Sequence, residues 1–195
     1  MYLTMGILAA LVERNRSGMG QVVDAAIVDG VASMMTMFAG LLPSGHISMD
    51  RDRNVLAGAA PFYRCYTCAD GKFVAVGPLE PKFFATLVEL LELPDTLVAA
   101  QYDEVRWPEI TRRLEETFAT RSRDEWAAHF EGSDACVTPV LELQEAVEHP
   151  HNAHRYAYEI RDGSAHAIPS PRFSRTPGRI APSSESDAML KHWGL

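Results

Sequence analysis

The sequence has few cysteines, no long apolar run and no basic cluster, and each shortage excludes a class of protein. Three cysteines in 195 residues are too few for a disulfide-built scaffold and indicate a reducing compartment, so we expect a cytoplasmic protein. No apolar run reaches the roughly 18 residues that a membrane-spanning helix needs, so we expect no membrane partner. Acidic residues outnumber basic ones by 26 to 18, which argues against nucleic acid because binding it depends on neutralising phosphates.

Motifs of several common enzyme classes are also missing. No G-x-S-x-G, G-x-G-x-x-G or P-loop pattern occurs, so serine-hydrolase, dinucleotide and nucleoside-triphosphate chemistry lose their main support. Cys65 and Cys68 have C-x-x-C spacing, but they fall on an expected strand, where residues three apart point to opposite faces. His149, His151 and His154 are close in sequence, yet histidines in a proline-bearing loop are more often solvated. We therefore expect no metal site.

The chain opens with an apolar stretch, residues 1–12, that is followed directly by charged residues. It has no basic region before it and no cleavage pattern after it, so it is not a signal peptide. The pattern predicts a buried helix that ends at Gly18, a residue suited to a left-handed C-terminal cap. Since no Ser, Thr, Asp or Asn caps its start, we expect the chain to be the later portion of a longer protein.

Residues 21–28 predict a short strand leading into a helix, and residues 31–42 predict a helix rich in methionine. Met34, Met35 and Met37 recur with Phe38 at spacings that place much of this sulfur on the helix surface. Two interpretations stay open. The methionines pack a core, or they form a pliable wall for a long acyl chain, because methionine adapts to irregular partners.

The clearest local signal is a β-hairpin over residues 62–77. Two β-prone runs flank an Asp-Gly pair, and the second run is apolar on both faces, which predicts a strand inside a sheet. Pro81 suits the first position of a following helix, so Glu80 lies at a strand-to-helix corner beside the positive end of a helix dipole. Such corners carry chemistry in α/β proteins, but a carboxylate there can also simply cap the helix. Both interpretations stay open.

The rest of the chain predicts mainly helices and then an irregular end. Ile110, Leu114 and Phe118 recur every four residues, and Ser122 with Glu125 forms an S-x-x-E capping box before another helix. Residues 136–141 predict a short strand. From residue 149 onward prolines recur, which predicts an extended arm with a short terminal helix over 187–193.

Four stretches resemble the family III CoA-transferase superfamily (CaiB/BaiF type), in particular its α-methylacyl-CoA racemase branch. They are GILAALVERNRSGMGQVVDAAIVDG at 6–30, APFYRCYTCADGKFVAVGPLEPKFF at 60–84, SDACVTPVLELQEA at 133–146 and PRFSRTPG at 171–178. The stretches keep the order and approximate separations of the family. The LEPKFF corner is similar to the racemases rather than to the formyl-CoA and carnitine CoA-transferases.

The resemblance implies an α/β fold in an interlinked homodimer, each chain having a large and a small domain. Residues 46–145 would form the small α/β domain with its hairpin sheet. Residues 1–45 would end a large-domain segment and include a connecting helix, and residues 146–195 would be a proline-rich arm returning to the large domain. The N-terminal Rossmann-like part of the family has no counterpart among these residues.

The implied substrate is an acyl-CoA thioester, with no further cofactor. The implied reaction removes the proton α to the thioester and returns it on either face, which requires enolate stabilisation and an acid/base pair. In the family that pair is a His and an Asp, the Asp in a D-F-G-G-G-type loop, and both precede the segment that matches Met1. We therefore expect this chain to be inactive alone.

Several residues of this chain match positions with roles in the family. Glu80 matches a glutamate that reaches the active site of the neighbouring subunit and supports proton transfer there. Leu56 and Tyr63 match residues that line the acyl pocket. The methionine-rich surface over which the family's acyl chain moves is matched by Met34, Met35 and Met37.

Near the mouth of the acyl pocket, the side-chain charges of this sequence differ from those that the family often has. Ala57 and Arg64 replace acids that the family often has in N-x-L-D-G-G-A-P-F-Y-D. The preferred acyl group is therefore left open. Two alternatives to a racemase also stay open: a CoA-transferase that uses an upstream aspartate as nucleophile, and a non-catalytic dimerisation module.

Overall fold

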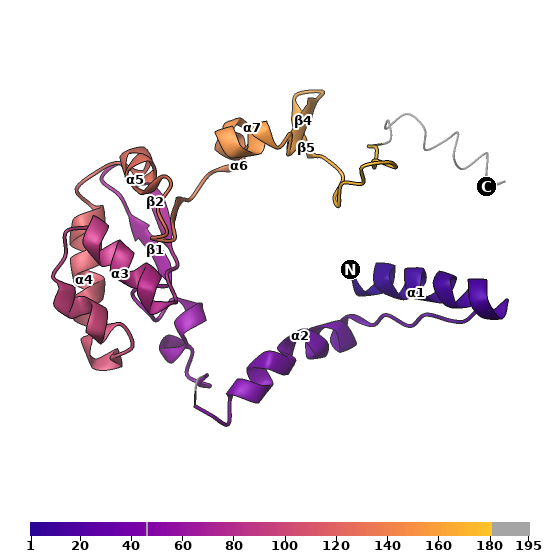
Figure 1. The fold of residues 1–195 in the computed structure, drawn as a ribbon, viewed down its shortest axis with the longest axis horizontal. Coiled ribbons are helices and arrows are strands. Elements are labelled where there is room, and N and C mark those ends of the chain that lie inside the picture. The colour runs from indigo at the N-terminus through magenta and orange to yellow at the C-terminus, as the bar shows by residue number, and fades with distance from the viewer. Residues whose placement is uncertain (46, 181–195) are drawn as a thin grey trace. The chain divides into compact units, whose positions relative to one another are not determined.

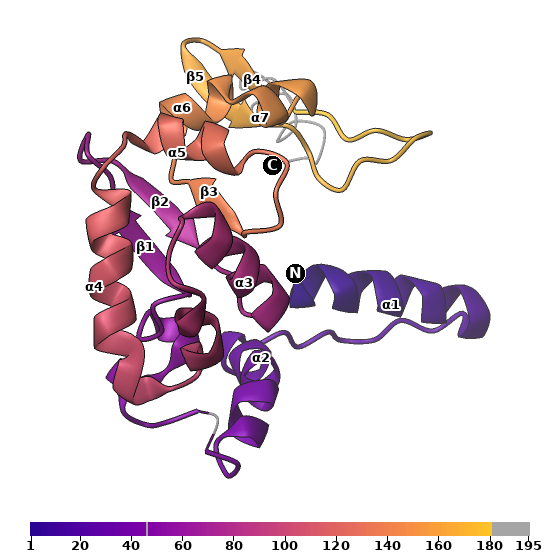
Figure 2. The ribbon, with the colours of Figure 1, turned by 60° about the vertical axis from the view of Figure 1, so that its left-hand side comes forward.

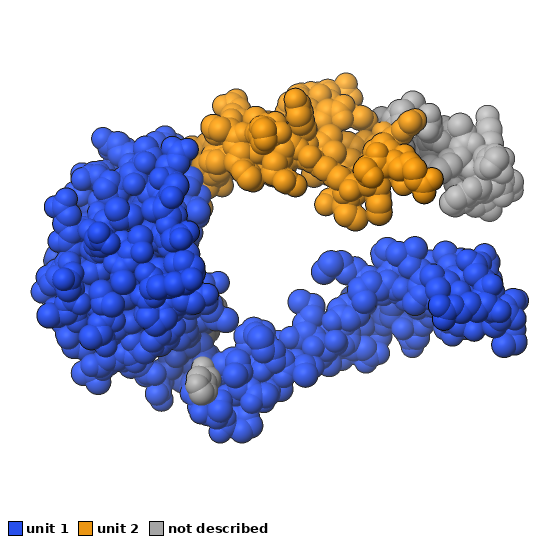
Figure 3. Space-filling model, viewed as in Figure 1, with its two compact units in different colours: residues 1–139 blue, residues 140–195 orange. Residues whose placement is uncertain are grey.

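The computed structural model describes residues 1–45 and 47–180 (Figure 1). The chain divides into two compact units, Met1–Pro139 and Val140–Leu195, which Figure 3 distinguishes by colour. The helix expected over 187–193 lies outside the described residues. Each unit has its own short antiparallel sheet, so the fold mixes helices and strands as the sequence predicts.

The first unit begins with two helices, α1 (Tyr2–Ser17) and α2 (Ile27–Leu41). Helix α1 ends where the sequence predicts: Gly18 has φ 76°, and its N–H donates to the Arg14 carbonyl. The strand predicted over 21–28 is wrong, because residues 19–26 pair with no strand in the part of the chain that the structure describes, and α2 begins at Ile27. Valine-rich runs favour extended backbone, but a strand needs a neighbour for its N–H and C=O groups.

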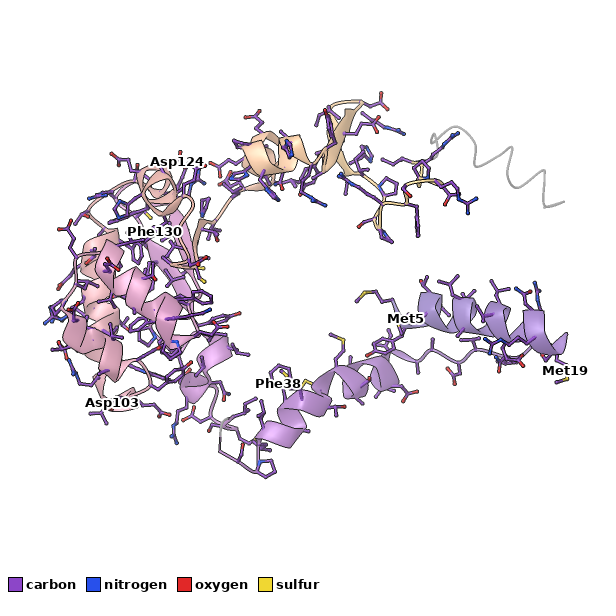
Figure 4. All side chains as sticks on the ribbon, in the orientation of Figure 1. Met5, Met19, Phe38, Asp103, Asp124 and Phe130 are labelled. Atoms are coloured by element: carbon purple, nitrogen blue, oxygen red, sulfur yellow. The ribbon has the colours of Figure 1, made fainter. Side chains whose placement is uncertain are left out.

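The sequence also predicts that α1 is buried, and this prediction is wrong. Within α1 and α2 no residue is buried, and Met5 is 63% exposed. Figure 4 shows the side chains along both helices, with Met5 and Phe38 labelled. The Tyr2 hydroxyl donates to Ser33 Oγ at 3.0 Å, which ties the start of α1 to α2. Helix α1 is apolar on most of its circumference, a pattern typical of helices that are enclosed.

The hairpin prediction is confirmed. Strands β1 (Arg64–Thr67) and β2 (Phe73–Val76) pair antiparallel around a turn in which Gly71 has φ 76°. A third strand, β3 (Val137–Pro139), pairs antiparallel with the other edge of β2, so the sheet order is β1-β2-β3. The apolar strand is therefore the central one, as predicted, and β3 is a shorter version of the strand expected over 136–141.

One face of this sheet packs against helices (Figure 2). These are α3 (Pro81–Leu90), α4 (Trp107–Phe118) and α5 (Arg123–Phe130). The short 3₁₀ segments of the unit are η1 (Arg51–Arg53), η2 (Val55–Ala57), η3 (Asp95–Ala100) and η4 (Glu104–Arg106). The core includes Phe84, Leu87 and Val88 of α3 and, as the sequence spacing predicts, Ile110, Leu114 and Phe118 of α4. The Ser122–Glu125 capping box is present at the start of α5.

The second unit contains α6 (Leu143–Glu148), α7 (Pro150–His154) and a hairpin of β4 (Tyr158–Arg161) and β5 (Ser164–Ala167). The prediction of an extended arm from residue 149 is therefore wrong over 150–167. Asp162 and Gly163 have φ 49° and 76°, the left-handed pair that a two-residue hairpin turn requires. The prolines lie outside both strands of this hairpin.

Candidate functional site

The two faces of the three-stranded sheet differ in their surroundings. Tyr66, Val74 and Val137 are buried on the face that meets the helices. Because side chains alternate along a strand, the intervening residues lie on the other face. There Cys65 is opposite Ala75, and Ala75 is opposite Thr138, so one row crosses all three strands. Cys65 and Thr138 at the ends of this row are exposed, which leaves this face of the sheet open.

The open face borders a hollow of about 430 Å³, which we call the sheet hollow. Leu56 and Tyr63 both line it, so the structure brings together the two residues matched to the family's acyl pocket. Arg64 lines it as well, so one of the two positions at which this chain differs in charge from the family pattern lies at the hollow itself. The remaining wall comes from the strands and the residues beside them, including Cys65, Ala75, Gly77, Cys136 and Thr138.

Glu80 lies just beyond β2, at the end of a corner formed by residues 77–80, which we call the Glu80 corner. Its backbone is extended (φ −75°, ψ 139°), and its carbonyl accepts hydrogen bonds from the Phe83 and Phe84 N–H groups. Its side chain makes no capping hydrogen bond. The interpretation of this carboxylate as a helix cap is therefore wrong. The backbone of Glu80 begins the helix, and its side chain is exposed and bonds to none of the first N–H groups of the helix.

The Glu80 carboxylate acts electrostatically on two neighbours. Burial raises the pKa of the Cys136 thiol, and the negative charges of Glu80 and Asp134 raise it further. Burial also raises the pKa of the Tyr102 hydroxyl, with Glu80 as the second cause. Because Cys136 lines the sheet hollow, the negative charge of Glu80 acts on a group in the wall of that hollow.

Cys136 is a residue that sequence reasoning missed. It has φ 53°, a left-handed conformation uncommon outside glycine, and its carbonyl accepts a hydrogen bond from the Gly77 N–H at 3.0 Å. The thiol donates to the Asp134 carbonyl at 3.5 Å. No sequence signal places it, because it lies just before β3 and its left-handed backbone does not follow strand alternation.

The three methionines matched to an acyl-chain surface lie on α2. Met34, Met35 and Met37 are 64%, 50% and 58% exposed. The sheet hollow is lined by none of them. Their exposure argues against the interpretation as core residues of the described chain, and their matched role stays a prediction.

The C-x-x-C pair and the histidines form no common site. Cys65 is exposed and Cys68 is buried, as the strand periodicity predicts. Across residues 1–45 and 47–180, no three His, Cys, Asp or Glu side chains are grouped so as to hold a metal ion. In the same part of the chain no helix has both the length and the apolar character to cross a membrane.

The fold and site define a mixed α/β protein with a largely apolar hollow beside an uncommitted carboxylate. Comparison with known proteins gives its family: the chain belongs to the CoA-transferase family III, whose family model matches residues 1–184. It is 43% identical over 191 residues to the alpha-methylacyl-CoA racemase of Mus musculus, covering 96% of this chain and 49% of that protein. It is 38% identical over 189 residues to the alpha-methylacyl-CoA racemase of Homo sapiens, covering 95% and 48%.

A solved structure shares the fold. The crystal structure of a hypothetical protein from Mycobacterium tuberculosis superposes with a TM-score of 0.70 at 18% identity, covering 96% of this chain and 52% of that one. The chain thus spans about half the length of the relatives it matches. The resemblance stated from the sequence is confirmed at the level of the family.

Proposed function

We propose that this chain forms part of an acyl-CoA racemase that exchanges the α-proton of 2-methylacyl-CoA thioesters. Relatives named alpha-methylacyl-CoA racemase, at 43% and 38% identity, support the reaction class. The structural observation that carries the proposal is the Glu80 carboxylate, exposed, free of any capping role and within electrostatic reach of the sheet hollow. A carboxylate placed in this way is available to a reacting centre.

Glu80 has a supporting role in this proposal. The α-proton of a thioester is weakly acidic, so its removal needs a stabilised enolate and a matched acid and base. The resemblance assigns those roles to a His and an Asp. A carboxylate beside an imidazole favours the imidazolium and orients it, so Glu80 would support this pair across the interface of a homodimer.

The sheet hollow takes the acyl group. Its volume of about 430 Å³ is within the range of small-molecule sites, roughly 300–1,000 Å³, and suits a branched acyl chain rather than a whole CoA thioester. Leu56 and Tyr63 supply the apolar wall. The exposed methionines of α2 would extend that wall for longer chains, because their flexible thioethers adapt to different lengths. No cofactor is needed, since the thioester itself acidifies the α-carbon.

The 195 residues alone are not expected to perform the reaction. They contain no D-F-G-G-G segment and so lack the counterpart of the Asp that the resemblance assigns. Purified 195-residue protein in deuterated water should leave the α-position of a 2-methylacyl-CoA unlabelled by mass spectrometry. Deuterium incorporation above the enzyme-free rate would overturn this part of the proposal.

A CoA-transferase is the second candidate, because the family takes its name from that reaction. A transferase moves CoA between two acids through an aspartyl mixed anhydride and a thioester, whereas a racemase exchanges only a proton. A longer polypeptide containing this chain should therefore label the α-position in deuterated water and transfer no CoA to an added acid. Activity in neither assay would favour the third candidate, a dimerisation module.

A further inference from the structure

Two side chains that follow η3 hold the backbone of the Glu80 corner. The Gln101 amide Nε2 donates to the carbonyl oxygens of Pro78 and Leu79, both at 3.0 Å. The Tyr102 hydroxyl donates to the same Leu79 oxygen at 2.6 Å. Three hydrogen bonds thus reach the two carbonyls that immediately precede Glu80, from residues more than 20 positions later in the chain.

Gln101 is fixed in place from several sides. It is only 2% exposed, its carbonyl accepts from Trp107 Nε1 at 2.8 Å, and its N–H donates to the Val98 carbonyl at 3.3 Å. Its side-chain oxygen is buried, and among the described residues it has no hydrogen-bond partner. A buried acceptor without a partner is destabilising, and an apolar residue of similar size would avoid that cost. The function of this glutamine therefore lies in its two donated hydrogen bonds.

Tyr102 connects the same corner to the core. Its ring lies edge-on to that of Phe62, with centroids 5.0 Å apart, and Phe62 is completely buried. The ring position is thereby set by core packing, and the hydroxyl reaches out to Leu79.

Both ends of the corner are also fixed. On the strand side the Gly77 N–H donates to the Cys136 carbonyl, and on the helix side the Glu80 carbonyl accepts from Phe83 and Phe84. The carbonyls of Pro78 and Leu79 are the groups between these anchors. Every backbone segment around Glu80 is therefore held while its carboxylate has no capping partner.

We propose that Gln101 and Tyr102 are positioning residues that hold the Glu80 carboxylate beside the sheet hollow through the carbonyls of Pro78 and Leu79. The catalytic value of this clamp rests on the function proposed above for Glu80. A supporting carboxylate is useful only when its backbone is pre-set, because a group displaced by about 1 Å loses much of its effect.

The Cys136 thiol provides a readout of the clamp that requires no turnover. The charged groups that act on it are Glu80 and Asp134, and both favour the neutral thiol. The thiolate is the form that iodoacetamide alkylates, so the pH profile of alkylation reports how close the Glu80 charge is. Rates at Cys136 and Cys65 are followed separately by peptide mass spectrometry on the 195-residue protein, with exposed Cys65 as the internal reference.

Glu80→Gln should speed alkylation of Cys136 about twofold or more near neutral pH and move its profile to lower pH, because a negative charge is lost. Gln101→Leu should do the same in the wild-type background and add nothing to Glu80→Gln. Tyr102→Phe, which removes only a hydroxyl, should shift the profile in the same direction by less. Trp126→Phe is the matched control, since it removes another buried side-chain hydrogen bond, to Phe118 at 2.9 Å, away from the corner.

The clamp is refuted if Gln101→Leu and Tyr102→Phe leave the Cys136 profile unchanged while Glu80→Gln shifts it. It is equally refuted if Gln101→Leu accelerates Cys65 and Cys136 alike, or if Trp126→Phe has the same effect, since either result means general loosening. These outcomes do not depend on α-proton exchange, so failure of the clamp and failure of the proposed reaction are separate results.

Discussion

Ser122 and Glu125 cap the start of α5 reciprocally. The Ser122 hydroxyl accepts from the Glu125 N–H at 3.4 Å, and the Glu125 carboxylate accepts from the Ser122 N–H at 2.8 Å. Glu80 occupies the corresponding N-cap position of α3, yet its side chain makes no such bond. Two helices of one unit therefore differ at their starts: the N-cap side chain of α5 caps the helix, whereas that of α3 does not.

This contrast predicts that the two side chains contribute differently to stability. Glu80→Gln should change the free energy of unfolding by no more than about 0.5 kcal/mol, as for surface substitutions that break no specific contact. Ser122→Ala should cost about 1 kcal/mol, because it removes a side-chain cap. Urea unfolding of both variants checks this. A loss of similar size for Glu80→Gln would restore the capping role that the structure argues against.

The capping box also predicts a pH dependence. Hydrogen bonds from the Ser122 hydroxyl and then from its N–H hold the pKa of Glu125 below its usual value. A folded-state pKa below the unfolded one contributes stability above the unfolded pKa, and this contribution is lost as pH falls through the folded pKa. The stability difference between wild type and Ser122→Ala should therefore be largest near neutral pH and shrink in acid. A difference that stays constant through this acid range would contradict the assignment.

Self-association is expected because α1 and α2 expose many apolar side chains. Leu3, Leu8 and Val12 on α1 are more than half exposed, and together with the methionines of α2 they make a large apolar surface. The 195-residue protein should form dimers or larger species at micromolar concentration in analytical ultracentrifugation. Leu8→Lys should weaken this association. Val105→Lys, at an apolar residue 90% exposed outside these helices, is the control and should not. A monomer that binds no hydrophobic dye would count against the prediction.

Local signals in the sequence predicted much of the first unit. The first hairpin, the start of α3 at Pro81 and the core stripe of α4 depend on neighbouring residues, so spacing and turn chemistry were sufficient. The hairpin of β4 and β5 also turns at an Asp-Gly pair, Asp162 and Gly163. It was missed because the frequent prolines around it favoured an irregular arm.

The parts that failed depend on contacts between distant segments. Whether residues 21–28 form a strand depends on a partner strand, and whether α1 is buried depends on what surrounds it, neither of which local pattern shows. For the candidate site, the resemblance placed Leu56 and Tyr63 in one acyl pocket but did not connect Cys136, Gln101 or Tyr102 with it. That Leu56 and Tyr63 share one hollow with Cys136, and that Gln101 reaches Leu79, follows only from the three-dimensional structure.

The most direct test of the account is α-proton exchange by a longer polypeptide that contains this chain, with and without Glu80→Gln. Deuterium incorporation into a 2-methylacyl-CoA should fall roughly ten- to a thousandfold in kcat for the variant, the range typical of single supporting groups, with the melting temperature nearly unchanged. Exchange at the wild-type rate in Glu80→Gln, or CoA transfer to an added acid without any exchange, would contradict the account.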